Sequence, residues 1–473
     1  MGVDGVEYRR SRTEPDLGLN GPGGITLTAA TIAAAAANPG AAVPSSSSLV
    51  PMSPSTPSGP PRALPAAVPN LPNLAPTLAL ALALALIFTA PPSAAQPARG
   101  TPFTPASDAQ VIERLPLRAS DAAERELAAL REAQRRDPAD PARAVELARR
   151  YYERATAWGD PRWVGYAQSV LAPWWNASAP PPAVRVMRAV LRQYGHAFEP
   201  ALADLAAAVE AEPDNVEAWA WRAAIHMVQA RYAEARRDCE RLLALATPLL
   251  GTACAAQVDA ATGRAAPAAA ALRAALAQAG SEALPEERLW ALTRLAETEE
   301  RRGEQAAAEA AFRAALALGV DDVYLLAAYA DFLLDRGRPR EVLALLEGKG
   351  RADPLLLRLA LAARAAGDTA AAQAHQRELA ARFDAARVRG DALHEKEEAR
   401  FVLAFGGDVR QALALARNNF ELQREPADAR VLLEAALAAR DRAGAQPALG
   451  WLADSGIESG VLRALARQVE ALP

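Results

Sequence analysis

The sequence is poor in the residues that most catalytic and metal centres require. Its 473 residues include only two cysteines and four histidines, and the histidines are widely scattered. His394 opens the run HEKEE, which lacks the second histidine that a zinc-protease helix carries four residues after the first. The chain also has no glycine-rich phosphate loop and no Gly-x-Ser-x-Gly turn. We therefore expect no catalytic residue, no metal site and no cofactor, and the protein is not predicted to be an enzyme.

Lysine and aromatic residues are also scarce. Lys349 and Lys396 are the only lysines, so the positive charge is almost entirely arginine, interspersed with acidic residues in a chain of net charge -4. Because no basic stripe is present, nucleic acid is not an expected partner. Aromatic residues make up 5% of the chain, whereas 51% is hydrophobic and mostly Ala and Leu, which lose little entropy in helices. The composition predicts an all-α protein.

The first hundred residues differ in composition from the rest. From Leu17 to Ala98 the only charged residue is Arg62, and Pro, Ala, Ser and Gly predominate. Such a stretch has too few branched and aromatic side chains to offset the entropy of ordering. We interpret residues 1–73 as a disordered extension, or as sequence upstream of a true start at Met52 or later.

Residues 74–95 resemble a signal peptide. Thr77 to Phe88 is an apolar run of 12 residues, which suits a secretory segment and is shorter than the roughly 20 residues of a membrane span. Small residues follow, and cleavage is expected after Ala95, leaving residues 96–120 as a linker. This predicts export to the periplasm or cell envelope, with no stable membrane span after processing. The alternatives are an uncleaved N-terminal anchor, or an Ala/Leu run without a targeting role.

Beyond residue 120 the sequence repeats itself at a spacing of 34 residues. Phe198 and Tyr232 are 34 apart, as are Ala201 and Ala235, and the turn residues Gly303 and Gly337. Independent pairs in one register predict a repeated helix-turn-helix unit.

One unit, residues 216–249, has the spacing Trp219, x2, Arg222-Ala223, x2, His226, then Ala235 and Cys239. This resembles the tetratricopeptide repeat, in which Leu, Tyr and Phe stand where this chain has Arg222, His226 and Cys239. The resemblance implies a right-handed α-solenoid of about eight tetratricopeptide-like repeats over residues 121–456. Residues 457–473 would then form a helix that caps the last apolar face.

The resemblance to exported bacterial tetratricopeptide proteins also implies a function. Such a protein is a non-catalytic scaffold of the cell envelope that binds a peptide or protein segment in its concave groove. Repeat positions 2, 5, 9 and 12 line that groove in the family. Here they are Glu217, Ala220, Ala224 and Met227, then Trp290, Thr293, Glu297 and Glu300, and then Tyr324, Ala327, Asp331 and Leu334.

Among these positions we take Glu217, Met227, Trp290, Glu297, Tyr324 and Asp331 as the predicted groove residues. They describe a mixed surface with aromatic anchors and an acidic rim, and without the Lys/Arg cluster that holds a terminal carboxylate in some family members. A basic or amphipathic segment is the expected guest. The alternatives are a structural protein that self-associates through its terminal helices, and a cytosolic scaffold if the apolar run is not a signal.

Two further groups of residues leave more than one interpretation open. The turn at Thr247-Pro248 lies midway between Cys239 and Cys254, so two antiparallel helices would bring the cysteines together, as a disulfide or as two buried thiols. Four tryptophans lie in the first predicted helix pair, where they form either a binding shelf or a cap over the open end of the core. They are Trp158, Trp163, Trp174 and Trp175.

Overall fold

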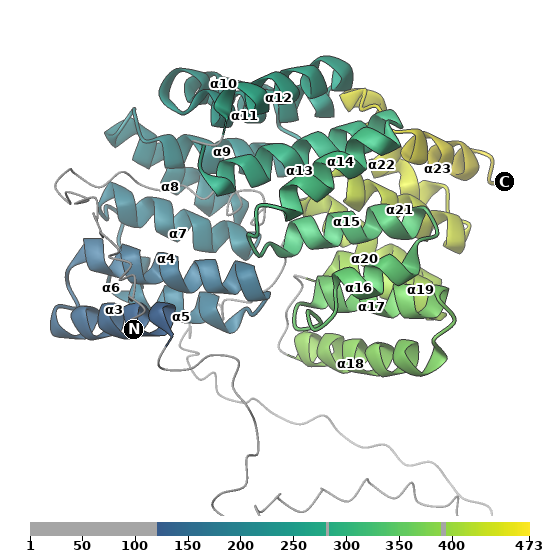
Figure 1. Ribbon diagram of the computed structural model, residues 1–473, viewed down its shortest axis with the longest axis horizontal. Coiled ribbons are helices and arrows are strands. Elements are labelled where there is room, and N and C mark those ends of the chain that lie inside the picture. Colours follow the sequence, from purple (N-terminus) through teal and green to yellow (C-terminus); the bar gives the residue numbers. More distant parts are fainter. Residues whose placement is uncertain (1–120, 281–282, 389–393) are drawn as a thin grey trace, which may run out of the picture. The chain divides into compact units, whose positions relative to one another are not determined.

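Paired antiparallel helices make up the chain from residue 121 onward in the computed structural model (Figure 1). The structure describes residues 121–280, 283–388 and 394–473. The predicted extension, signal-like segment and linker, residues 1–73, 74–95 and 96–120, lie outside the described residues. Glu126 to Pro473 belong to one compact unit.

In the described residues, α3 (Ala122–Arg136) precedes eight well-packed pairs. The pairs are α4 (Pro141–Trp158) with α5 (Arg162–Val170) and the short α6 (Ala172–Trp175), α7 (Pro182–Tyr194) with α8 (Phe198–Ala211), α9 (Val216–Val228) with α10 (Tyr232–Leu245), α11 (Pro248–Ala261) with α12 (Ala265–Ala279), α13 (Pro285–Arg302) with α14 (Gln305–Leu316), α15 (Val323–Asp335) with α16 (Pro339–Leu345), α17 (Asp353–Ala365) with α18 (Thr369–Val388), and α19 (Glu395–Phe405) with α20 (Val409–Leu422).

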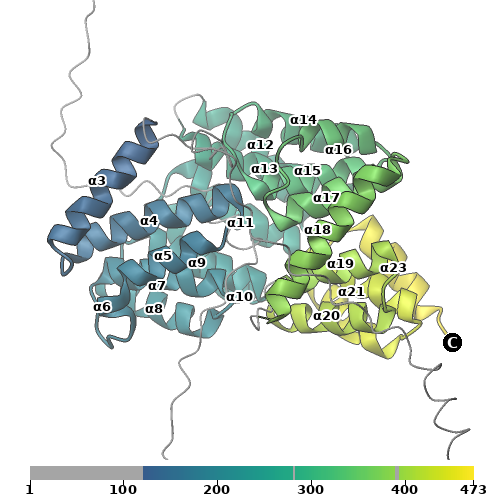
Figure 2. The same cartoon turned by 90° about the horizontal axis from the view of Figure 1, so that it is seen from below.

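The last helix pair of the array is loosely packed, and the terminal helix that follows it lies within residues 457–473, where the sequence predicts a capping helix. The helix α21 (Pro426–Ala439) packs mainly on α20 and on α23 (Gly460–Glu470), and less on α22 (Gln446–Ser455), which follows a 3-10 turn at Ala443–Ala445. In Figure 2, α19 to α23 form one group of helices in green to yellow. The fold is the all-α solenoid of helix-turn-helix repeats that the sequence predicts.

The turn inside each pair uses a residue in the left-handed backbone region. The 34-residue register is visible here, since His196 and Ala230 have φ of 56° and 58°, and Gly303 and Gly337 have φ of 84° and 66°. Glycine occupies this position in most pairs because it lacks the Cβ that makes positive φ costly. A left-handed residue therefore reverses the chain once per repeat.

Small residues let the helices pack closely. Ala201, Ala235 and Ala308, which occupy the same repeat position, are fully buried. A side chain at Gly251 of α11 would place its Cβ 2.8 Å from the Cα of Leu243 in α10, so these two helices touch backbone to backbone. Larger side chains fill the spaces between pairs, and each buried Leu or Phe contributes roughly 1.5 to 3 kcal/mol.

Cys239 and Cys254 form a disulfide between α10 and α11, with their Cα atoms 5.4 Å apart. The bond joins the second helix of one repeat to the first helix of the next. A cross-link that closes a loop of this length is worth about 3 kcal/mol on the chain-entropy model.

The tryptophans of the first pair pack on the core. Trp163, Trp174 and Trp175 are partly buried against the main hydrophobic cluster, and Trp163 stacks on Tyr151 with ring centroids 5.7 Å apart. This arrangement matches the cap interpretation. None of the helices that the structure describes is long and apolar enough to cross a membrane.

Repeats far apart in the sequence also touch, because the array winds back on itself. The backbone N–H of Arg424 donates to the carbonyl of Val228 at 2.7 Å, and the indole N–H of Trp451 donates to the hydroxyl of Tyr232 at 3.0 Å. These partners are separated by about six 34-residue periods. The C-terminal repeats thus lie against α9 and α10.

The left-handed turns give a test of the fold. Gly337→Ala should lower the free energy of unfolding by about 1 kcal/mol, because φ is 66° there although space around the Cβ is open. Gly450→Ala, at an exposed position inside α22 with equally open space, should raise it by about 0.5–1 kcal/mol. Urea unfolding of both variants measures the difference. Equal effects at the two sites would contradict the assigned turn.

Candidate functional site

A cavity of about 900 Å³ lies on the inner side of the array. Every first helix from α9 to α21 contributes to its lining, as does the start of α23. The first helices face inward because the second helices cover the outside of each pair. The C-terminal repeats, which return toward α9 and α10, bound the cavity on the far side and leave it partly open to solvent.

The lining is rich in charge and predominantly basic. It contains nine arginines and Lys396, against five glutamates and two aspartates. The whole chain, in contrast, has a net charge of -4. Basic residues are thus concentrated around the cavity of an otherwise acidic protein.

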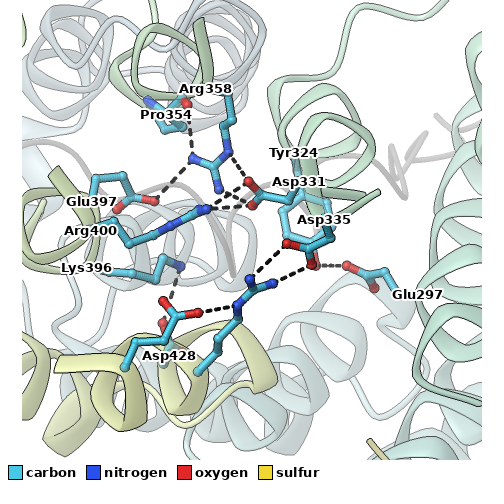
Figure 3. A network of polar contacts seen from close by, with 12 residues as sticks. Glu297, Tyr324, Asp331, Asp335, Pro354, Arg358, Lys396, Glu397, Arg400 and Asp428 are labelled. Atoms are coloured by element: carbon cyan, nitrogen blue, oxygen red, sulfur yellow. Dashed lines mark hydrogen bonds and ion pairs between the residues drawn. The ribbon is translucent and has the colours of Figure 1, made fainter. Parts of the chain in front are cut away.

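Asp331 of α15 is the centre of one ion-pair cluster (Figure 3). Arg358 of α17 donates to its carboxylate at 2.6 and 3.2 Å, and Arg400 of α19 donates at 3.0 Å to each oxygen. Burial alone would raise the pKa of Asp331, but the two arginines hold it well below its usual range. Three consecutive repeats are joined through this one carboxylate.

Two more ion pairs attach α21 to the same wall. Arg430 donates to both oxygens of Asp335 at 2.6 and 2.9 Å, and to Glu434 at 2.7 Å. Lys396 of α19 lies 3.3 Å from the carboxylate of Asp428. Burial lowers the pKa of Lys396, but the carboxylates of Asp428, Glu397 and Glu425 together raise it more, so the amine stays charged.

A further cluster connects α13 to α15. Tyr324 donates its hydroxyl hydrogen to Glu297, and the guanidinium of Arg294 lies 3.1 Å from Glu297 and 4.7 Å from the centre of the Tyr324 ring. The Nε and Nη2 atoms of Arg294 are buried without a hydrogen-bond partner, as is the Nε atom of Arg301. Buried N–H groups without an acceptor are costly.

Burial also changes the acidity of two glutamates in the lining. Burial first, and then Asp335 and Glu297, raise the pKa of Glu300 to about 7, although Arg336 opposes this shift. The pKa of Glu425 is also raised, by burial and by Asp428. Because both carboxyls bind protons near neutral pH, the cavity carries more positive charge than a count of residues indicates.

The structure brings together four of the six predicted groove residues. Met227, Glu297, Tyr324 and Asp331 line the cavity. Glu217 lies elsewhere, buried in a two-bond ion pair with Arg149 of α4 at 2.6 and 2.8 Å. The two residues are 68 positions apart in the sequence, which is two repeat periods. The side chain of Glu217 therefore pairs with a residue two repeats earlier in the array.

Trp290 does not line the cavity and belongs to the hydrophobic core, where it is 4% exposed. The acidic rim expected from the sequence is not found, because arginines neutralise the carboxylates of both Glu297 and Asp331. The groove positions do not include these arginines, since Arg294 follows the groove position Thr293 by one residue. The same positions counted from Pro426 reach Ala427 and Arg430, which do line the cavity.

Comparison with known proteins gives no match to a protein-family model and no match to a curated protein. The repeats of this chain are tetratricopeptide-like. Among solved structures the chain is similar to one from the APC/C hetero-tetramer Cut9-Hcn1, at 13% identity and TM-score 0.42, over 73% of this chain and 66% of that one, just under two thirds of its length.

The chain is also similar to the human IFIT1 dimer with m7Gppp-AAAA, at 16% identity and TM-score 0.40, over 74% of this chain and 86% of that one. For the TPR domain of P58(IPK) the identity is 14% and the TM-score 0.19, over 65% of this chain and 98% of that one. These similarities are too weak to transfer a function.

The acidity of Glu300 predicts a dependence of stability on pH. Since its pKa is raised on folding from 4.5 to about 7, the folded state binds a proton that the unfolded state releases. Its contribution to stability is complete below pH 4.5 and is lost as the pH rises through 7. Between pH 5 and 8 the free energy of unfolding of Glu300→Gln should therefore fall by roughly 1–3 kcal/mol less than that of the wild-type protein. Urea unfolding across this range tests it, and an unchanged slope would contradict the shift.

Proposed function

We propose that the protein is a non-catalytic scaffold that binds a segment of a partner protein in the cavity. The observation that carries the proposal is the convergence of all first helices from α9 to α21 on one partly open cavity. Its volume of about 900 Å³ is within the usual range of ligand sites, about 300–1,000 Å³. A short peptide segment fits such a space better than a long helix.

The walls of the cavity are suited to binding. Asp331, Asp335 and Asp428 each fix arginine or lysine side chains from another repeat. A partner that binds here therefore meets side chains that are already ordered, and binding costs less entropy. Apolar surface is present too, from Met227, Ala328 and Val461.

The chemistry of the lining supports binding rather than catalysis. Of the lining residues none is cysteine or histidine, and Ser459 is the single serine. Its hydroxyl oxygen accepts a hydrogen bond from the N–H of Leu462 and so caps α23. The carboxylates Glu297 and Asp331 are held by arginines rather than placed beside a nucleophile.

A location in the bacterial cell envelope is part of the proposal. It rests on the apolar run from Thr77 to Phe88 and, independently, on the disulfide between Cys239 and Cys254. Disulfides persist in the oxidising periplasm and are rare in the cytosol.

Site-specific photocrosslinking in cells tests the binding role. A photoreactive residue in place of Val461 or Ala328, both of which line the cavity, should capture a partner protein. The matched control is Leu243 in α10, which is 51% exposed, as Val461 is 50% exposed, but lies outside the cavity. Equal capture at Leu243, or none at the lining positions, would contradict the cavity as the binding site.

Intact-mass measurement on separated cell fractions tests the location. Expressed from its own upstream DNA, the protein should appear in the periplasmic fraction as a species that begins near Gln96. Its two cysteines should react with an alkylating reagent only after reduction. A full-length cytosolic species with two reactive thiols would refute the export proposal.

A further inference from the structure

The charges of the cavity are not balanced in one region, where α13 faces the turn before α21 and the start of α23. We infer that this region binds an oxyanion, a carboxylate or phosphate group carried by the bound segment. The subsite consists of Arg294, Arg301 and Arg424 together with the first N–H groups of α23. This inference rests on the proposed function and names the chemistry of the segment that the cavity accepts.

Unused hydrogen-bond donors mark the subsite. Arg294 is 7% exposed, and its ion pair with Glu297 uses only Nη1, which leaves Nε and Nη2 buried and without acceptors. Arg301 lies seven residues, or two helical turns, further along the same face of α13. It makes no ion pair with the described residues, and its Nε is also buried without an acceptor. An arginine fork in this state binds an oxygen acid group readily, since carboxylate and phosphate match its geometry.

Arg424 comes from the other end of the array. The hydrogen bond from its backbone N–H to Val228 fixes the turn against α9, while its guanidinium makes no ion pair within the described residues. Burial raises the pKa of Tyr232 to about 12, and the charges of Arg301 and Arg424 both act to lower it. The two arginines therefore lie near the same tyrosine, although 123 residues separate them in the sequence.

The start of α23 adds donors of another kind. Ser459, Gly460, Val461 and Leu462 all line the cavity, and α23 packs against α13. The first N–H groups of a helix have no partner within the helix and carry a partial positive charge. Ser459 satisfies the N–H of Leu462, which leaves those of Gly460 and Val461 for a ligand. Helix starts of this kind bind anionic groups.

Of the acidic residues nearby, Glu297 and Glu425 do not cancel this charge, and Glu458 lies beside the start of α23. Glu297 is shared between Arg294 and Tyr324, and burial and Asp428 raise the pKa of Glu425, so that part of it is protonated at neutral pH. A basic guest would leave the buried donors unpaired and add repulsion. An anionic guest accepts hydrogen bonds from the buried donors and avoids the repulsion. The cavity is therefore expected to prefer an anionic segment, whereas the acidic groove positions led to the expectation of a basic one.

Calorimetric titration of the full chain tests the subsite with two probes, inorganic phosphate and succinate, each against sodium chloride at equal ionic strength. At least one probe should bind saturably. In the double variant Arg301→Gln, Arg424→Gln the dissociation constant of that probe should rise at least about tenfold, because two charged hydrogen-bond donors are removed. The two arginines make no ion pair with the described residues, so the variant is expected to fold, which circular dichroism checks.

Arg417→Gln is the matched control, because Arg417 is exposed on α20 outside the cavity and should leave binding unchanged. Preference for phosphate would point to a phosphorylated segment, and preference for succinate to an acidic one. No binding beyond chloride, or equal binding by the double variant, would overturn the inference. Photocrosslinking at Val461 distinguishes loss of the anion subsite from failure of the scaffold. If the double variant still captures a partner at Val461, the protein is a scaffold without the anion subsite.

Discussion

The return of the C-terminal repeats to α9 and α10 is the contact on which the interior of this protein depends. A hydrogen bond from Arg424 to the backbone of Val228 and one from Trp451 to Tyr232 hold repeats that are about 200 residues apart. Without them the inner face would be an open groove in contact with water. With them it is a partly open cavity in which several of the charged side chains are buried, and buried charges require partners.

That constraint accounts for the ion pairs between repeats. Asp331 holds arginines from two later helices, and Arg430 reaches back to Asp335. Each of these pairs restricts the angle between neighbouring repeats as well as neutralising charge. Where the constraint is not met, at Arg294 and Arg301, donors remain without acceptors. These donors lie in the region of the cavity where we propose that an anionic group binds.

The 34-residue period predicted the fold because it is a local property of the chain. Helix-forming alanine and leucine, a small residue where paired helices touch, and a turn residue that tolerates positive φ recur within each repeat, as Ala201, Ala235, Gly303 and Gly337 show. The disulfide partners could also be paired from the sequence, since residues equidistant from a turn face each other in a hairpin. The groove positions that the tetratricopeptide resemblance implied placed Met227, Glu297, Tyr324 and Asp331 on the inner surface.

The sequence by itself thus determined that the chain is an all-α array of helix pairs and which face of each first helix points inward. Only the tertiary structure decided what that face contains. The carboxylate of Glu217 pairs with Arg149, which lies two repeats away, and Trp290 is part of the core. The arginines that neutralise Glu297 and Asp331 come from the same helix and from the next two repeats, in side-chain contacts that the groove positions do not describe. The contacts of Arg424 with Val228 and of Trp451 with Tyr232 join repeats across the superhelix. A repeat pattern specifies the contacts between neighbours, whereas contacts across the superhelix depend on small angles summed over many repeats.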